Sequence, residues 1–534
     1  MVSPFVRGRW LFALSAASAL LIAAAFPPYH YDLMPWFGLA PLLYALRRTG
    51  LLAGAGLSLL AGVLFYIFTF SWAGSIVEIG VANWLLFMVV PQSLYFLVFG
   101  IFYTLISRNI GSWNIIAAPA LWVALEYARS NLFFLALPWN LLAHSQYRNL
   151  PVIQIADVTG VYGISFLMVM VNQLLSQLPD SAIFRRWKSS ADAVSQTNTT
   201  NWAAQIVTVV FCLIVVLSYG WNRQSESIGT GHLRVAMVQP NLLTRDNMSH
   251  AEQAAHLDGY GQLTRSAAAA KPELIVWPAS SLPAALKASR LVRHMVIQLA
   301  RETGVPLLVG GSGNEKMGAN GNETPAYSNS EFLILPSGRM KGQFNKIRLL
   351  PFNEYVPLKG IVQWPEMIAA IRKDFLPGES YTIFQVSDAR FGTPICWENL
   401  FPDHFRRFVK AGANFMVSTT NEGFYGPTAA PHQTLAINIF RAVENRVAIA
   451  RAATTGVSAF IDPDGRIAER VQDSSGKDLF VSGFIVRDVP LSDKKTFYTI
   501  YGDVFAYMAI GITLLSVLYS FFIYRADTSS KHRL

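Results

Sequence analysis

The sequence predicts an integral membrane protein in which a multi-span α-helical bundle, of about eight spans, carries one α/β domain outside the bilayer. Two observations support this fold class. Of the 534 residues, 52% are hydrophobic and only 14% are charged, which is too apolar for one soluble domain. The apolar excess lies at the two ends of the chain, whereas residues 221–503 read as short strands alternating with helices.

The apolar segments approach the ~20 residues that cross a bilayer. The second and fifth are short, so they must extend through their flanks, tilt, or dip into the membrane without crossing it. The first is too long for a signal-peptide core and lacks a small-residue cleavage site before polar sequence, so we expect it to be retained. The predicted spans are residues 10–26, 33–46, 51–70, 84–106, 113–125, 160–178, 202–219 and 505–524.

Basic residues alternate between successive loops. With a cytoplasmic N-terminus, the cytoplasmic side holds 11 Lys and Arg residues against three Asp residues, as the positive-inside rule requires. Both termini and the polar loop 189–201 are then cytoplasmic. Residues 1–220 form a seven-span domain, residues 221–503 an outer, periplasmic domain, and residues 504–534 a closing span and tail. Because topology explains most of the net charge of +10, this charge gives no support for nucleic-acid binding.

The outer domain is long enough for a core of its own. Strands are predicted at residues 233–239, 274–277, 305–309, 331–335, 392–396, 415–419, 447–452, 457–461 and 479–486. Helices are predicted at residues 251–270, 286–303 and 432–445. Pro336-Ser-Gly338 and Asp462-Pro-Asp-Gly465 read as hairpin turns, because proline and glycine set the backbone angles there.

Cys396 is one of only two cysteines and stands where the predicted strand 392–396 ends, two residues before Glu398. A nucleophilic thiol benefits from a strand end with charge nearby. A free cysteine also serves as a small buried hydrophobe, so this fragment alone leaves both interpretations open. The other cysteine, Cys212, lies inside the seventh predicted span and is not expected to form a disulfide with Cys396.

Lys346 is the second candidate. It begins the run Lys346-Ile-Arg-Leu-Leu-Pro-Phe-Asn-Glu354, which we expect to lie near a strand end although no strand range is predicted directly before it. A fixed ammonium beside a thiol lowers the pKa of the thiol and stabilises the oxyanion of a tetrahedral intermediate. The alternative is that Lys346 is a solvated surface charge.

These motifs resemble the nitrilase (carbon-nitrogen hydrolase) superfamily, in which Glu, Lys and Cys at three strand ends form the catalytic site. The motifs are Trp277-Pro278, residues 346–357 and Cys396-Trp397-Glu398. Asn421-Glu-Gly-Phe-Tyr-Gly426 is similar to the loop after the next strand in that family. With the surrounding spans, the whole chain resembles the apolipoprotein N-acyltransferase family of membrane enzymes. The resemblance implies a nitrilase-like αββα sandwich for the outer domain.

The resemblance also implies residue roles. Cys396 would be the nucleophile and Lys346 the oxyanion partner, with Glu354 and Glu398 as supporting carboxylates. The substrate-binding candidates, expected as mobile lids over a lipid entrance, are Met248, Trp397, Phe424 and Tyr425, with core packing as the alternative.

One departure concerns the general base. The family places a glutamate directly after Trp-Pro, where this chain has Ala279. Alanine cannot accept a proton, so the chain is expected to be inactive or slowed by about 10²- to 10⁴-fold. An engineered substitution and a natural degenerate copy are both compatible with this sequence. Glu354 and Glu398 are the carboxylates considered as weak substitutes.

The implied reaction transfers the sn-1 acyl chain of a phospholipid, such as phosphatidylethanolamine, through a Cys396 thioester to the N-terminal diacylglyceryl-cysteine of apolipoproteins. The implied location is the bacterial inner membrane, and neither cofactor nor metal is expected. Two alternatives remain at this stage: a membrane-tethered amidase or nitrilase, and a non-catalytic lipid-binding homologue.

Overall fold

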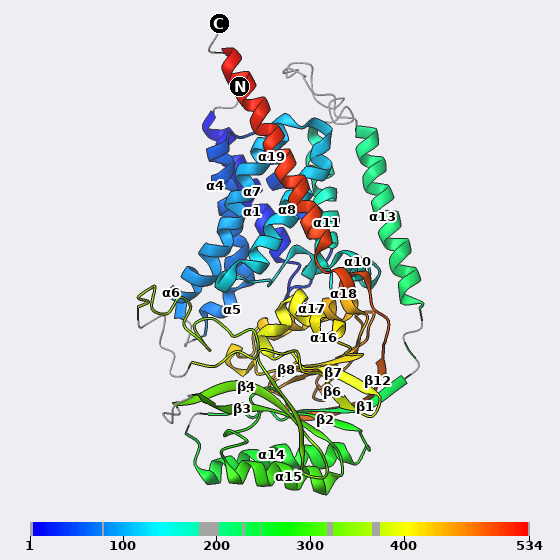
Figure 1. Cartoon of the computed structure of the whole chain (residues 1–534). Helices are drawn as coiled ribbons and strands as arrows, with labels where there is room; N and C mark the ends of the chain where they lie inside the picture. The colour runs from blue at the N-terminus through cyan, green and yellow to red at the C-terminus, as the bar shows by residue number, and fades with distance from the viewer. Residues whose placement is uncertain are drawn as a thin grey trace. The chain divides into compact units, whose positions relative to one another are not determined.

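The computed structural model describes residues 4–76, 80–180, 202–226, 229, 231–245, 247–317, 324–365 and 374–531. The chain divides into two compact units, a helical unit formed by Met1–Ser225 with Asp503–Leu534, and a sheet unit formed by Glu226–Gly502 (Figure 1). The predicted polar loop 189–201 lies outside the described residues. The two units have separate cores.

The helical unit is built almost entirely from apolar helices. Its longer helices are α1 (Pro4–Ala23), α4 (Leu51–Thr69), α7 (Val90–Asn109), α8 (Asn114–Asn131), α11 (Val161–Ser176), α13 (Trp202–Gln224) and α19 (Val504–Lys531). Its short helices are α2 (Pro35–Gly38), α3 (Ala40–Leu46), α5 (Ser71–Gly74), α6 (Gly80–Trp84), α9 (Leu150–Ile153) and α10 (Ala156–Thr159). Short 3₁₀ and π turns join them, including the π turn Leu85–Val89 that leads into α7.

Four helices among the described residues are long and apolar enough to cross a membrane: Leu51–Thr69, Gly80–Asn109, Trp202–Gln224 and Val504–Ile523. Further apolar helices are shorter. The membrane character predicted from composition is therefore confirmed, whereas the number of spans stays a prediction. The predicted span 33–46 is divided into α2 and α3, where Asn172 Oδ1 accepts hydrogen bonds from the backbone N–H groups of Leu39 and Ala40, each at 2.8 Å.

Small residues let α4 and α7 approach closely. A Cβ added to Gly62 of α4 would lie 2.8 Å from the Cβ of Phe96, and one added to Gly100 of α7 would lie 2.6 Å from the Cβ of Ser58. Such close approach allows dense van der Waals packing. In lipid this packing holds helices together, because no hydrophobic driving force acts between them.

The sheet unit contains two six-stranded sheets. The first has the order β12 (Gly483–Leu491), β1 (Gly231–Gln239), β2 (Leu274–Val276), β3 (Leu307–Met317), β4 (Thr324–Ile334) and β5 (Met340–Asn345). The second has the order β11 (Ile467–Arg470), β10 (Ala459–Ile461), β9 (Ile449–Ala453), β8 (Phe415–Thr420), β7 (Ala389–Gly392) and β6 (Phe384–Val386). In each sheet parallel central strands are flanked by antiparallel pairs.

Helices cover the outer face of each sheet. The first sheet packs against α14 (His250–Ala268) and α15 (Arg290–Thr303), whose apolar residues share one core cluster with β1 to β4. The second packs against α16 (Pro402–Lys410) and α17 (Ala430–Asn445). Asn438 of α17 accepts a hydrogen bond from Ser418 of β8, and Phe408 of α16 packs on Gly392 of β7. Figure 1 shows the resulting order of helices, sheet, sheet and helices, which is the αββα sandwich that the resemblance implies.

The predicted strand 392–396 differs from the structure. The strand β7 ends at Gly392, and the residue before Cys396, Ile395, makes only an isolated bridge to Thr419 of β8. Pro394 lacks an N–H group and cannot continue the ladder. The N–H group of Ile395 donates to a side chain, Glu398 Oε2, at 2.8 Å. Cys396 therefore begins a short 3₁₀ turn, Cys396–Leu400, and is not a strand residue.

Candidate active site

Cys396 occupies a strained backbone position. Its φ is +50°, in the left-handed region that residues with a Cβ rarely adopt. Such strain persists only where the surroundings fix the backbone, and it concentrates at functional sites. Cys396 as a whole residue is half-buried.

Glu398 holds this turn against the segment that carries Lys346. Its Oε1 accepts hydrogen bonds from the backbone N–H groups of Ile347 at 2.7 Å and Arg348 at 2.8 Å, while its Oε2 accepts from Ile395. Burial alone would raise its pKa, but His404, 3.1 Å away, and the backbone donors lower the pKa of Glu398 below its ordinary value. The ionised carboxylate therefore ties together the two segments on either side of it.

We expect Glu398→Gln to lower thermal stability by about 2–4 kcal/mol at pH 7, because an amide cannot accept from three N–H groups and turns its own donors toward some of them. Since the folded-state pKa of Glu398 is depressed, its contribution is complete above the unfolded value near 4.5 and is lost as the pH falls through the folded value. Melting temperatures in detergent at pH 7 and pH 4 measure this effect. A Gln variant as stable as the parent at pH 7 would contradict it.

Lys346 follows β5 and is 2% exposed, so it is not a solvated surface charge. Its Nζ lies 2.7 Å from Glu354 Oε2. Glu354 also accepts hydrogen bonds from Asn329 Nδ2 at 2.9 Å and from the backbone N–H of Leu350 at 2.7 Å. Burial would lower the pKa of Lys346, but Glu354 and then Cys396 raise it above its ordinary value, so the ammonium stays charged.

The thiol of Cys396 lies within electrostatic reach of Lys346. Burial raises the pKa of Cys396, and Lys346 and a hydrogen bond with Thr420 only partly offset this effect, which Glu422 reinforces. The thiol is therefore protonated at neutral pH. A nucleophilic role would require a neighbouring group that removes its proton.

The candidate lid residues lie in different places. Phe424 and Tyr425 form the turn Gly423–Tyr425 after β8, with ring centroids 4.1 Å apart. Phe424 is 44% exposed, whereas Tyr425 is buried. Burial, followed by the nearby Cys396 and Glu422, raises the pKa of Tyr425 well above its ordinary value. The Tyr425 side chain is therefore near the thiol, and only Phe424 is presented to solvent.

Trp397 and Met248 are both half-buried. The Trp397 ring packs edge-on against Phe401, with centroids 5.5 Å apart. Met248 precedes the first turn of α14, where its carbonyl oxygen accepts a hydrogen bond from Gln253. Leu243, which the sequence did not single out, is the residue that reaches the 423–425 turn, since a Cβ on Gly423 would lie 2.2 Å from Leu243 Cδ2.

Ala279 lies where the sequence places it, just after the end of β2, and is 1% exposed. The carboxyl group of Glu331 in β4 lies beside it. Sequence reasoning did not identify Glu331, although a glutamate that opens the apolar run Glu331-Phe-Leu-Ile-Leu is an unusual residue for a buried strand.

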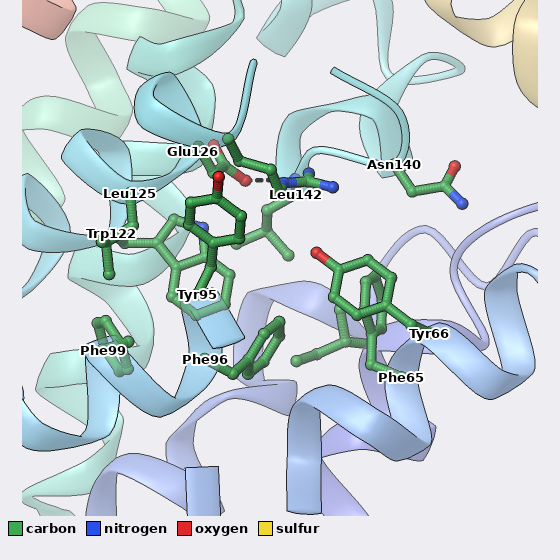
Figure 2. A pocket seen from close by; sticks show the side chains of 12 residues that line it. Phe65, Tyr66, Tyr95, Phe96, Phe99, Trp122, Leu125, Glu126, Asn140 and Leu142 are labelled. Carbon is green, nitrogen blue, oxygen red and sulfur yellow. Dashed lines mark hydrogen bonds between the residues drawn. The ribbon is translucent and has the colours of Figure 1, made fainter. Parts of the chain in front are cut away.

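The helical unit contains an aromatic-lined pocket. Figure 2 shows Tyr95, Phe96 and Trp122 on its walls, with Glu126 bonded to the backbone N–H of Leu142 at 2.7 Å. Arg129 also lines the pocket and donates to the carbonyl oxygen of Trp139 at 3.0 Å. These two charged side chains are therefore held by the backbone of the 139–142 segment.

Comparisons with known proteins agree with this architecture. Residues 18–174 match the apolipoprotein N-acyltransferase N-terminal domain, and residues 234–493 match the carbon-nitrogen hydrolase domain. The apolipoprotein N-acyltransferase of Geobacter metallireducens is 33% identical over 512 residues, which cover 93% of each chain. That of Chlorobaculum tepidum is 29% identical, covering 94% of this chain and 95% of its own. A solved amidase from Nesterenkonia sp. covers 50% of this chain and 95% of its own, at 20% identity and a TM-score of 0.35.

Two domain models thus match in the order in which the helical and sheet units occur, and a relative above 30% identity spans nearly the full length of both chains. The chain belongs to the apolipoprotein N-acyltransferase family.

Proposed function

We propose that this protein transfers the sn-1 acyl chain of a phospholipid to the α-amine of an N-terminal diacylglyceryl-cysteine on apolipoproteins. The observation that carries the proposal is the arrangement of a buried, charged Lys346 beside a thiol held at a strained turn. This arrangement suits formation and breakdown of a thioester, and membership of the family supports the choice of substrates.

In the first half-reaction the sulfur of Cys396 attacks the sn-1 ester carbonyl, and the oxygen of the tetrahedral intermediate becomes negative. Lys346, held by Glu354 at 2.7 Å, stabilises that charge. The lysophospholipid leaves, and the acyl chain remains on Cys396. In the second half-reaction the lipoprotein amine attacks the thioester, which releases the thiol and completes a ping-pong cycle.

Both substrates are lipids, which accounts for the fixation of a nitrilase-like domain to membrane helices. We propose phosphatidylethanolamine as the donor and the bacterial inner membrane as the location. The alternation of basic residues supports a periplasmic sheet unit and cytoplasmic termini. Trp397, next to Cys396 in the sequence, and Phe424, next to Tyr425, are the proposed contacts with the incoming acyl chain, because both are partly exposed.

The test uses the full-length protein in proteoliposomes that contain phosphatidylethanolamine with a labelled sn-1 chain. The proposal predicts label on Cys396 that hydroxylamine removes, followed by transfer of the label to a diacylglyceryl peptide. A membrane-tethered amidase would instead hydrolyse small amides without lipid. A lipid-binding homologue would retain donor without covalent label. Either of these results would overturn the proposal.

A further inference from the structure

Glu331 is a buried carboxyl group that the proposed reaction does not yet use. It lies on β4 and is 0% exposed. Its Oε1 accepts a hydrogen bond from Thr419 Oγ1 of β8 at 2.7 Å, so its side chain lies between the two sheets. Figure 1 shows these two strands in the facing layers of the sandwich. Its Oε2 is buried and has no hydrogen-bond partner among the described residues. An unpaired buried carboxyl oxygen is costly and calls for an explanation.

The carboxyl group of Glu331 lies close to Ala279. A Cβ on Gly310 of β3 would be 2.8 Å from Glu331 Oε1 and 2.7 Å from the Cα of Ala279. Gly310 is also the strand partner of Glu331. The Glu331 side chain therefore crosses β3 at its glycine and reaches the end of β2. This position is accessible because residue 310 has no side chain.

Strand register places Glu331 on the face that carries the rest of the site. Glu331 pairs with Phe344 of β5, so Lys346, two residues further, continues the same face. Asn329, two residues before Glu331, also shares this face and donates to Glu354 at 2.9 Å. The neighbouring sheet contributes Thr419, which bonds Glu331 and bridges to Ile395, directly before Cys396.

We propose that Glu331, on β4, is the general base of this protein. It performs the role that Ala279, after the end of β2, cannot perform. This inference rests on the proposed function. It corrects the expectation that Ala279 leaves the site without a base. Glu354 and Glu398 are not the substitutes, because Glu354 is paired with Lys346 and Glu398 accepts hydrogen bonds from three backbone N–H groups.

The chemistry of the group fits the task. Burial raises the pKa of Glu331 to about 8, and the hydrogen bond from Thr419 opposes the rise only in part. A base with a pKa near the working pH exchanges protons effectively with a thiol. A carboxyl group of ordinary pKa would be a much weaker proton acceptor.

The proton balance closes in both half-reactions. Glu331 accepts the proton of the Cys396 thiol as sulfur bonds to the ester carbon. When the ester C–O bond breaks, the leaving lysophospholipid oxygen takes this proton. In the second half-reaction the neutral lipoprotein amine attacks the thioester, its proton passes to Glu331, and Glu331 returns it to sulfur as the C–S bond breaks.

The test measures single-turnover formation of the Cys396 thioester from labelled phospholipid in four proteins: the parent, Glu331→Gln, Ala279→Glu, and the exchange variant Ala279→Glu with Glu331→Ala. We expect Glu331→Gln to lose about 10²- to 10⁴-fold in rate and the exchange variant to recover to within about tenfold of the parent. Full activity of Glu331→Gln would overturn the proposal. So would a parent that forms no thioester while Ala279→Glu does.

A second readout separates this proposal from the proposed function. In a Cys212→Ala background, iodoacetamide alkylates Cys396 without any lipid substrate. We expect Glu331→Gln to slow alkylation at pH 8 by about tenfold, because the thiol loses its proton acceptor. If the alkylation rates differ as expected but no protein forms a thioester, the acyl-transfer proposal is wrong while the assignment of Glu331 as the base is supported. Equal alkylation rates in the parent and in Glu331→Gln would contradict the assignment of Glu331 as the base.

Melting temperature distinguishes catalysis from structural damage. Removing an unpaired buried carboxyl group should leave Glu331→Gln at least as stable as the parent. The matched control is Glu444→Gln, another glutamate with no exposed surface, whose Oε1 lies 2.7 Å from Arg441 Nη2. This control should melt lower and keep its rate per folded molecule. A Glu331→Gln protein that lost stability and activity together, as a structural residue would, contradicts the proposal.

Discussion

Cys396→Ala is expected to abolish the thioester and to reduce lipoprotein N-acylation by about 10⁴-fold or more, because the proposed mechanism has no route to transfer without the sulfur. The loss should appear in both half-reactions, since the acyl chain is carried on this atom. Single-turnover labelling and transfer to a diacylglyceryl peptide measure the two steps separately. Transfer without a labelled intermediate would show a direct reaction between the two lipids and would contradict the ping-pong scheme.

The backbone at Cys396 provides an internal control for this variant. Because φ is +50°, a Cβ is strained there whichever residue carries it. Cys396→Gly should therefore be as inactive as Cys396→Ala yet more stable by about 1 kcal/mol. Cys212→Ala, in α13 of the helical unit, should keep its activity. Equal melting temperatures of the Gly and Ala variants would contradict the inference that the turn is strained.

Several apolar runs that the sequence predicts as strands are strands in the structure, whereas the run 392–396 is not. The runs at 233–239, 274–277 and 415–419 correspond to β1, β2 and β8, and both hairpin turns occur where proline and glycine predict them. The strand β5, Met340-Lys-Gly-Gln-Phe-Asn345, was not predicted because only alternate positions are apolar and one of them is glycine. Its strand state depends on pairing with β4, which no local pattern reveals.

In the candidate site too, residues that belong to a local sequence motif were predicted, whereas a residue that matters through its contacts in the fold was not. Cys396 and Lys346 are marked by motifs, because each lies in a contiguous segment with its neighbours. Glu331 is not marked, because its significance depends on Gly310 and Ala279 on two other strands. From the sequence, Ala279 predicts a missing group. In three dimensions the carboxyl group of Glu331 lies close to this residue.

Lys346→Met is expected to lower the rate of thioester formation by about 10²- to 10³-fold, because the charge that meets the oxyanion is removed. It should also destabilise the protein by about 3–5 kcal/mol, since Glu354 would be left as a buried carboxylate without its cation. The double variant Lys346→Met with Glu354→Gln removes both charges. We expect it to recover most of the melting temperature and none of the rate.

This pair of variants separates the two roles of the lysine. Recovery of stability without activity identifies Glu354 as a positioning residue and Lys346 as the group that acts on the intermediate. Glu354→Gln alone should retain measurable thioester formation with a charged but less constrained lysine, because the single amide oxygen can still accept a hydrogen bond from either Asn329 or Leu350. Thermal melts and single-turnover rates on the three proteins decide the matter. If Lys346→Met kept the rate of the parent while losing stability, the lysine would be structural, and another donor would have to stabilise the oxyanion.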